Sequence, residues 1–390
     1  MENIVAYRSN RSYVFQDLIW NPDHFPWRQE DRRRCEKDPS SQQTPLSALL
    51  SGPTVGGFWD PGDNAPRSIS QHWFNTVCPI NERRIISTKE VKTAVYWDKG
   101  SVLFDAWQKV LSEAPEKCIE VQGSPEDPFP QPFDTWLWAG EWVLSMWDRI
   151  KDSPVSRLLG PSPIIQAAVA RNEYLFRPRG PRPPVAISTN PYDGMVAAHV
   201  RRGDFEGHCR HLATWNSTFY SWNQLSFLSD RFIHPPNYEW GTQSEEGVRH
   251  YLKHCYPDMD TIVEKIRKSK ADYVRAGKPN DYRHLNVIFI LSDDQSEWLE
   301  DLKKSLRNDG WSTVVSTRDL VVDAEQREVG VAIDMELARK AALFIGNGVR
   351  SSLTDCDAIA DTNYQWSSLT SNIVYRRLVD GRENMSIRFF

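Results

Sequence analysis

Residues 195–202 read MVAAHVRR, and this stretch decides the fold of the second half of the chain. From Met195 to Val200 it is an apolar run without helical periodicity, which is typical of a buried strand. Arg201 and Arg202 follow directly. Two adjacent guanidinium groups at the end of a buried strand are costly unless anions compensate them. The stretch therefore predicts a core strand that ends in an ion-paired or anion-binding turn.

Strands and helices alternate through the rest of this half. Apolar runs and amphipathic segments predict further strands at 286–291, 312–316 and 343–345. They also predict helices at 295–308, before Gly310, and at 329–341. Strands that alternate with helices of this length indicate a parallel α/β sheet.

Ligands of a parallel sheet bind at the carboxyl ends of its strands. Polar residues follow three of the predicted strands, at Arg201–Arg202, Ser292–Asp294 and Asn347. We therefore expect these residues to surround a ligand.

The first half of the chain is less regular. Its periodicity indicates a short strand around Tyr13–Ile19 and helices at 2–9, 100–113, 132–152 and 161–173. Residues 21–85 are rich in proline, glycine and charge, so we expect long loops there. The proline-rich run 177–184 has the composition of a linker. The expected domains are therefore 1–185 and 186–390.

Composition excludes several functions. The net charge of −5 argues against sequence-independent nucleic-acid binding, which needs a basic field. No apolar run is long enough to span a bilayer, and the N-terminus lacks the pattern of a signal peptide. The absence of a GxGxxG motif and of a P-loop disfavours dinucleotide oxidoreductases and ATPases.

No metal site is predicted. The six cysteines show no zinc-type spacing, although Cys209 and Cys255 could pair in an oxidising compartment. His208, Cys209 and His211 lack a fourth ligand. Asp258 and Asp260 match a DxD metal motif, but they directly precede a predicted helix, and we interpret them as its N-terminal cap.

Arg201 and Arg202 suit a phosphate, because a guanidinium group can bind phosphate oxygens in a bidentate manner. Positive charge at the β-phosphate would stabilise a departing nucleoside diphosphate. The alternative is a salt-bridged surface turn in which Asp204 neutralises one arginine. Asp334 also has two interpretations. It could contact a ligand, but an acidic residue near a helix start is usually an N-terminal cap or a partner of the helix dipole.

The tryptophans also have two interpretations. The segment from Trp136 to Trp147 holds several of the sixteen tryptophans of the chain. Flat rings of this kind either fill a core or line a groove for a sugar acceptor.

Several of these residues resemble the motifs of a known enzyme family. His199-Val200-Arg201-Arg202 resembles the HxRR signature of the α1,2-, α1,6- and protein O-fucosyltransferases. Residues 333–347, with Asp334 near the start and FIGN at the end, are similar to the third motif of the GDP-fucose protein O-fucosyltransferases, including fungal members of basidiomycete type. That motif continues as Ser-Ser-hydrophobic, which Ser367, Ser368 and Leu369 match. The NRSYVF run at 10–15 resembles a further strand of this family.

The resemblance implies an α/β, GT-B-like fold of two Rossmann-like domains whose parallel sheets face a central cleft. It implies inverting transfer of fucose from GDP-fucose to a protein or glycan acceptor in the ER or Golgi, with no metal and no cofactor. Arg201 would be catalytic at the β-phosphate, with Arg202 supporting the site. His199 and Asp334 would contact the nucleoside, Ser367, Ser368 and Leu369 would lie at the phosphates, and Asn347 is a further substrate-binding candidate. Asp204 and Glu206 are candidates for the general base by proximity alone.

Two departures from the family pattern stand out. The Gly-Gly-x-Asn-Asn-type loop that precedes the Asn-Arg-Thr strand of the family is missing. We therefore expect Met1 to be an internal methionine of a longer product, and any membrane contact to be made through an N-terminal anchor absent here.

The motif SSLT occurs at 351–354 and again at 367–370. We interpret Val349–Gln365 as a retained intron, with a genuine loop insertion as the alternative.

The sequence is also compatible with two competing functions. A relative that kept the fold and the ligand site could have lost the chemistry, and an enzyme of the same fold could use another nucleotide sugar.

Overall fold

The computed structural model describes residues 1–19, 43–127, 129–177, 190–203, 205–214, 217–235, 241, 244–277, 284–294, 296–349 and 369–390. They divide into two compact units, one formed mainly by Met1–Gln166 and the other mainly by residues 167–390. The change of unit falls within α10 (Pro163–Asn172), upstream of the expected boundary at 185/186. The expected boundary was placed at a proline-rich run because of its composition. The observed one depends on which residues contact each other in space. Most of the proline-rich run lies outside the described residues.

β9 (Met195–His199) is the central strand of a five-stranded parallel sheet in the second unit. The strand order is β11-β10-β9-β12-β13, which corresponds to 3-2-1-4-5 in chain order. In this doubly wound arrangement the order reverses beside the first strand, here between β9 and β12. The other strands are β10 (Val287–Leu291), β11 (Thr313–Ser316), β12 (Leu343–Gly346) and β13 (Ile387–Phe389).

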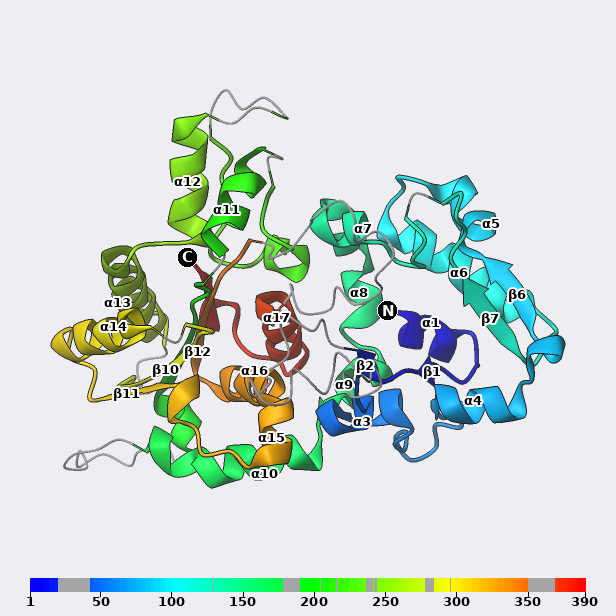
Figure 1. The fold of residues 1–390 in the computed structure, drawn as a ribbon, viewed down its shortest axis with the longest axis horizontal. Coiled ribbons are helices and arrows are strands. Elements are labelled where there is room, and N and C mark those ends of the chain that lie inside the picture. Colours follow the sequence, from blue (N-terminus) through cyan, green and yellow to red (C-terminus); the bar gives the residue numbers. More distant parts are fainter. Residues whose placement is uncertain are drawn as a thin grey trace, which may run out of the picture. The chain divides into compact units, whose positions relative to one another are not determined.

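Helices cover both faces of this sheet, with α13 and α14 on one side and α16 and α17 on the other (Figure 1). On the first side, Ile266 of α13 and Leu302 of α14 join Val196 and Ile288 in one buried cluster. Burial on both faces explains why these strands are continuous apolar runs in the sequence. The helices are α11 (Phe205–Thr214), α12 (Glu245–Cys255), α13 (Met259–Arg275), α14 (Glu297–Asn308), α15 (Ala324–Glu328), α16 (Gly330–Lys340) and α17 (Leu369–Val379).

The four predicted strands and two predicted helices of this half are confirmed within a few residues. β13 was not predicted, because its middle residue is the buried Arg388. Its guanidinium pairs with Asp230 at 2.9 Å and with Asp272 at 3.1 Å. These carboxylates come from distant segments and allow a charged residue inside a strand of the core.

The described part of the first unit contains only two-stranded sheets. The parallel pairing expected of a Rossmann-like domain is present as β1–β5 and β6–β7, whereas β2–β3 and β4–β8 are antiparallel. The strands are β1 (Val14–Phe15), β2 (Leu18–Ile19), β3 (Gln43–Thr44), β4 (Leu50–Ser51), β5 (Ile69–Ser70), β6 (Arg84–Ser87), β7 (Ile119–Gln122) and β8 (Gly160–Pro161).

The expected helices at 2–9 and 100–113 are confirmed. The single helix expected at 132–152 is wrong, because the extended backbone of Gly140 (φ −97°, ψ 180°) separates α7 from the 3-10 helix Glu141–Met146 that precedes α8. The loops expected at 21–85 are also wrong in part, since helices occur there. The helices are α1 (Glu2–Arg8), α3 (Leu46–Leu49), α4 (Gln71–Val77), α5 (Thr88–Lys92), α6 (Gly100–Glu113), α7 (Thr135–Ala139), α8 (Trp147–Ile150) and α9 (Pro154–Arg157).

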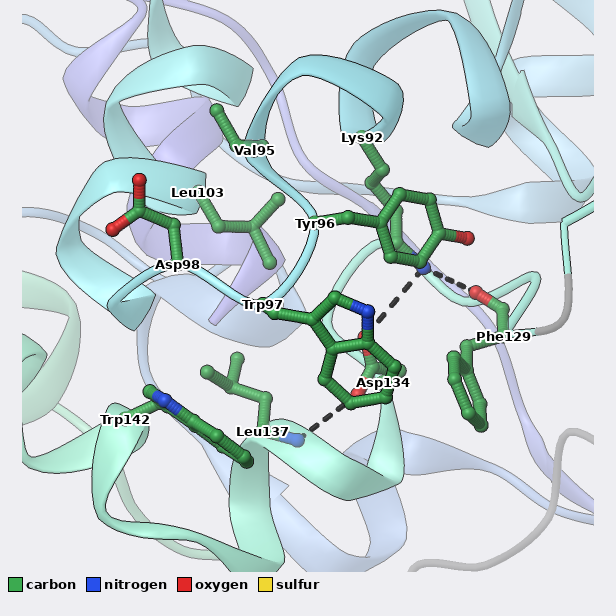
Figure 2. Close-up of a pocket in the computed structure, with 10 residues that line it drawn as sticks. All are labelled: Lys92, Val95, Tyr96, Trp97, Asp98, Leu103, Phe129, Asp134, Leu137 and Trp142. Atoms are coloured by element: carbon green, nitrogen blue, oxygen red, sulfur yellow. Dashed lines mark hydrogen bonds and ion pairs between the residues drawn. The ribbon is translucent and has the colours of Figure 1, made fainter.

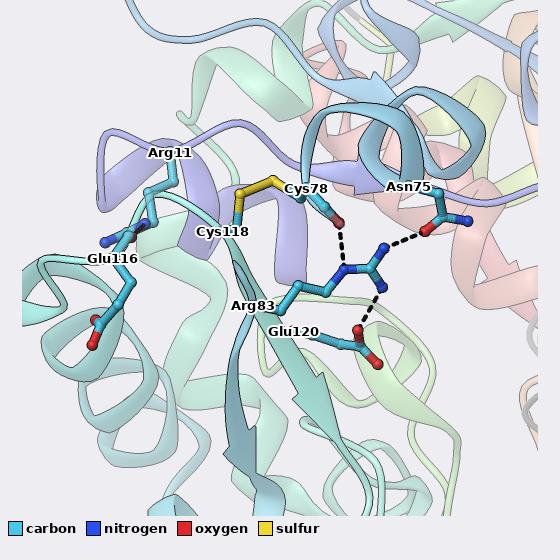
Figure 3. Close-up of a disulfide and its surroundings, with 7 residues drawn as sticks. All are labelled: Arg11, Asn75, Cys78, Arg83, Glu116, Cys118 and Glu120. Atoms are coloured by element: carbon cyan, nitrogen blue, oxygen red, sulfur yellow. Dashed lines mark hydrogen bonds and ion pairs between the residues drawn. A yellow bond between two sulfur atoms is a disulfide. The ribbon is translucent and has the colours of Figure 1, made fainter. Parts of the chain in front are cut away.

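A disulfide between Cys78 and Cys118 links the ends of two segments that lead into β6 and β7 (Figure 3). Next to it, Arg83 donates to the carbonyl of Cys78 at 2.7 Å, to Glu120 at 2.8 Å and to Asn75 at 2.9 Å. The cross-link and this arginine stabilise a sheet of only two strands, which would be marginal by itself. Across the described ranges, no helix has the length and hydropathy needed to cross a membrane.

Arg377 of α17 is fully buried and caps the C-terminus of α16. Its guanidinium donates to the carbonyls of Ala338 and Ala342, each at 3.0 Å, and to the carbonyl and hydroxyl of Ser386 at 3.0 and 2.9 Å. The last carbonyls of a helix have no partner within the helix, so this side chain satisfies groups that would otherwise be buried without one.

We expect Arg377→Met to lower the free energy of unfolding by roughly 2–4 kcal/mol, because several buried carbonyls lose their donor at nearly constant side-chain volume. Urea denaturation measures this. The matched control is Arg275→Met at an exposed arginine of α13, for which we expect a change within about 0.5 kcal/mol. A loss for Arg377→Met no larger than that of the control would contradict the capping role.

Candidate functional site

The carboxyl ends of β9, β10, β11 and β12 carry the polar residues of the candidate site. β9 ends at His199, and Val200 extends the pairing by donating its N–H to the carbonyl of Leu291 at 2.8 Å. Gly203, with a φ of 65°, then turns the chain away from the sheet. This left-handed conformation is easily adopted by glycine and leaves Arg201 and Arg202 at the edge of the sheet.

Asp293, the second residue after β10, contacts both arginines. Its Oδ1 accepts the backbone N–H of Arg202 at 3.0 Å, and its Oδ2 forms an ion pair with Nε of Arg201 at 3.1 Å. The Arg201 contact is not aligned as a hydrogen bond. The Arg201 side chain remains 32% exposed. Arg201 is thus a cation at the carboxyl edge that pairs with Asp293 and stays partly accessible to a ligand.

Arg202 points into the protein and is only 4% exposed. Its guanidinium lies between two aromatic rings, 4.3 Å from the ring centroid of Tyr256 and 4.0 Å from that of Trp298, and it donates to the carbonyl of Pro257. Burial lowers the pKa of Arg202. Because its contacts are internal, this side chain anchors the turn that presents Arg201.

His199 contacts the start of α17, where its Nδ1 lies 2.9 Å from the hydroxyl of Thr370. Gly346, the last residue of β12, permits this contact, since a Cβ there would lie 2.4 Å from Cγ2 of Thr370. Burial lowers the pKa of His199 to about 3, and the neighbouring Arg201 acts in the same direction. The imidazole is therefore neutral at physiological pH and can both donate and accept a hydrogen bond.

Asp334 on α16 is a buried carboxyl group, 8% exposed. Its Oδ2 accepts a hydrogen bond from the hydroxyl of Thr317, directly after β11, at 2.7 Å. Within the described part of the chain, its Oδ1 has no hydrogen-bond partner. Burial raises the pKa of Asp334 to about 7. A buried acceptor without a partner is costly, so this oxygen is suited to a ligand donor.

Asn347 follows β12 and is 5% exposed. Its Nδ2 donates to the carbonyl of Cys255 at 2.6 Å, and its Oδ1 accepts the N–H of Val349 at 3.3 Å. These contacts tie the end of β12 to the C-terminus of α12. The disulfide between Cys209 and Cys255, which the sequence had only suggested, joins α12 to α11 at the same place.

The remaining predicted residues have mixed outcomes. Leu369 begins α17 and is partly buried, and Glu206 forms an ion pair with Arg210 at 2.8 Å. Asp258 caps α13 by accepting the N–H of Thr261 at 2.8 Å, which confirms the interpretation of the DxD match. Cys209 is in the disulfide, so its sulfur is not available as a thiolate ligand. Ser367, Ser368, Asp204 and all of the suspected intron except Val349 lie outside the described residues.

Sequence reasoning missed several residues of the site. Asp293 was part of an expected polar cluster, but its contacts with Arg201 and Arg202 were not predicted. Thr370 could have been suspected from its position directly after the Ser-Ser-Leu motif. Tyr256 and Trp298 gave no local signal, because an aromatic residue on an amphipathic segment is normally part of the core.

The raised pKa of Asp334 predicts a pH dependence of stability. Between about pH 4 and pH 7 the folded chain keeps a proton on this carboxyl that the unfolded chain has lost, so stability falls as pH rises through this range. Asp334→Asn removes this dependence, which amounts to at most about 1.4 kcal/mol per pH unit. Urea denaturation of wild type and variant at several pH values measures the difference. Asp260→Asn, at an exposed aspartate of α13, is the control, and equal slopes for wild type and Asp334→Asn would contradict the prediction.

Comparison with known proteins supports the fold. No protein-family model matches the chain, and no curated protein matches it in sequence. The crystal structure of POFUT1 in complex with GDP-fucose is 15% identical, with a TM-score of 0.50 over 100% of this chain and 92% of its own. The apo form of POFUT1 is also 15% identical, with a TM-score of 0.49 over 99% of this chain and 90% of its own. The first of these confirms the expected fold class, which is mixed α/β and GT-B-like with parallel sheets.

Proposed function

We propose that this protein is a glycosyltransferase that moves fucose from GDP-fucose to a hydroxyl group of a protein or glycan acceptor. The observation that carries the proposal is the accessible guanidinium of Arg201 at the carboxyl end of the central strand, beside the switch point of the sheet. Open α/β sheets bind their ligands at this place. The likeness in fold to a structure that contains GDP-fucose supports the choice of donor.

In the proposed reaction, the acceptor oxygen attacks the anomeric carbon of fucose from the face opposite GDP, so that transfer inverts the configuration. The new carbon–oxygen bond forms as the bond to the β-phosphate oxygen breaks, and GDP leaves with the bonding electrons. The acceptor proton passes to a base. Arg201 stabilises the negative charge that develops on the β-phosphate. Its fixed charge takes the part that a metal ion has in other transferases, so we propose that no metal and no cofactor are required.

The surrounding residues bind the donor in this proposal. Asp293 orients Arg201, and Arg202 anchors the turn from inside. Asp334 gives up its proton when the donor binds and offers its second carboxylate oxygen to the N–H groups of the base, and neutral His199 contacts the nucleoside. Ser367, Ser368 and the N-terminus of α17 at Leu369 receive the phosphates, since helix N-termini bind anions. Asn347 supports the loop that follows β12.

GDP binding tests the proposal. GDP should raise the melting temperature of the protein, and Arg201→Ala should weaken GDP binding by about 10- to 100-fold, because one or two charge-assisted hydrogen bonds are lost. Thermal-shift titration with GDP and UDP measures this. Arg210→Ala is the control, at an exposed arginine of the adjacent α11, and should bind GDP as wild type does.

The other outcomes are equally informative. Tighter binding of UDP than of GDP would indicate that the donor is another nucleotide sugar. GDP binding without transfer of labelled fucose to any protein or glycan acceptor would identify an inactive relative. GDP binding that is insensitive to Arg201→Ala would contradict the proposed site. Transfer that stops after chelation of metal ions would contradict metal independence.

We also propose that the protein resides in the secretory pathway. The two disulfides support this, because such bonds persist in oxidising compartments and are rare in the cytosol. Removing the Cys209–Cys255 bond by Cys209→Ala with Cys255→Ala should cost about 4 kcal/mol by the chain-entropy argument for a loop of this length. Chemical denaturation measures it. A protein that stays equally stable after reduction of both disulfides would contradict a role for them in the native compartment.

A further inference from the structure

The first unit contains a small cavity that the proposed function does not use. Four aromatic side chains line it, from Tyr96, Trp97, Phe129 and Trp142 (Figure 2). Its volume is about 40 Å³. A cavity of about 10–15 Å³ is enough to hold one water, so this one can take one or two hydroxyl groups. A larger ligand must therefore extend over the rings at its mouth.

Trp97 is the centre of this aromatic group. Its ring centroid lies 6.4 Å from that of Tyr96, 5.9 Å from that of Phe129 and 6.3 Å from that of Trp142. Trp97 is nevertheless 63% exposed, and Trp142 is 37% exposed. The backbone of Trp97 has a φ of 64°, which is rare for a bulky residue. An exposed indole held in such a conformation is not explained by packing of the core.

The polar floor of the cavity holds one buried cation and two carboxylates. Lys92 is 2% exposed, and its Nζ lies 3.2 Å from Asp127 and 3.6 Å from Asp134. It also donates to the carbonyls of Phe129 and Gln131. Asp134 in turn accepts the N–H of Leu137 at 2.9 Å, which fixes its carboxylate. A buried lysine between two carboxylates leaves no excess positive charge for an anionic ligand.

A cationic ligand is not favoured either. The ammonium of Lys92 lies 5.5 Å from the ring centroid of Tyr96 and already supplies a positive charge beside the aromatic group. A second cation would be repelled by this ammonium at close range, and the two carboxylates that could offset the repulsion are already engaged by Lys92, by the hydroxyl of Tyr96 and by the N–H groups of Phe129 and Leu137. The ligand that fits the remaining surface is neutral, with an apolar face for the indoles and hydroxyl groups for the carboxylate and the cavity.

We propose that this aromatic group binds a neutral pyranose residue of a glycan. The C–H groups on one face of a pyranose carry partial positive charge and pack against the negative face of an aromatic ring. Its hydroxyl groups can donate to the carboxylate of Asp134 and enter the cavity. Of the tryptophans in the segment 136–147, for which a sugar-binding role was one expectation, Trp142 lines the cavity and Trp138 does not. Trp147 is buried, and the side chain of Trp136 lies outside the described ones. This saccharide site does not depend on the donor chemistry proposed for the second unit.

Saturation-transfer NMR tests the proposal on the whole protein with a panel of neutral probes, namely glucose, galactose, mannose, fucose, N-acetylglucosamine and their β-linked disaccharides. At least one should bind in the millimolar range, with transfer strongest to its ring C–H protons. Trp97→Ala should weaken binding at least tenfold, and Trp97→Phe should keep part of it. Trp73→Ala is the matched control, because Trp73 is 54% exposed on α4 and does not line the cavity.

Several results would overturn the inference. These are no binding of any probe, binding that Trp97→Ala and Trp142→Ala leave unchanged, or Trp97-dependent binding of tetramethylammonium in place of sugars. Far-UV circular dichroism verifies that the variants are folded. GDP should stabilise Trp97→Ala as much as wild type, so failure of the saccharide site and failure of the donor site give different results.

Discussion

The two contacts that Asp293 makes with Arg201 and Arg202 are the constraint on which the second unit depends. The central strand is buried on both faces and is followed at once by two cations. An uncompensated cation at that position would be strongly destabilising. One carboxylate from the neighbouring strand holds the backbone of the turn and the side chain of its first arginine. The second arginine is thereby directed inward, between Tyr256 and Trp298.

Polar contacts also hold the other strand ends at the carboxyl edge of the sheet. Each strand end is fixed by a polar contact to a helix or its flanking turn, as in His199 with Thr370, Thr317 with Asp334, and Asn347 with Cys255. These contacts hold the polar side chains at the carboxyl edge of the sheet, where the donor would bind in the proposed function. Arg201 and Oδ1 of Asp334 differ from the rest, because one is accessible and the other has no hydrogen-bond partner among the residues that the structure describes. Those two groups therefore give the site its capacity for a ligand.

The first unit is stabilised differently. Its described strands form only pairs, so cross-links and buried ion pairs take the place of a wide sheet. The Cys78–Cys118 disulfide and Arg83 act at one end, and Lys92 with Asp127 and Asp134 act near the aromatic cavity. A buried lysine between carboxylates is costly to assemble. Lys92 and Asp134 line the same cavity as the exposed indoles of the proposed saccharide site.

The sequence by itself determined the strands and helices of the second unit, because burial on both faces makes each strand a short apolar run and amphipathic helices separate them. It also indicated that polar residues would gather at the strand ends, since parallel strands share one carboxyl edge. Only the tertiary structure decided which partners meet there. Asp293 pairs with Arg201, and Thr370 meets His199, 171 residues away in sequence. Such pairings depend on strand order and on the close approach that Gly346 permits. The first unit was hardest to foresee, because disulfides and ion pairs between distant residues leave no periodic pattern.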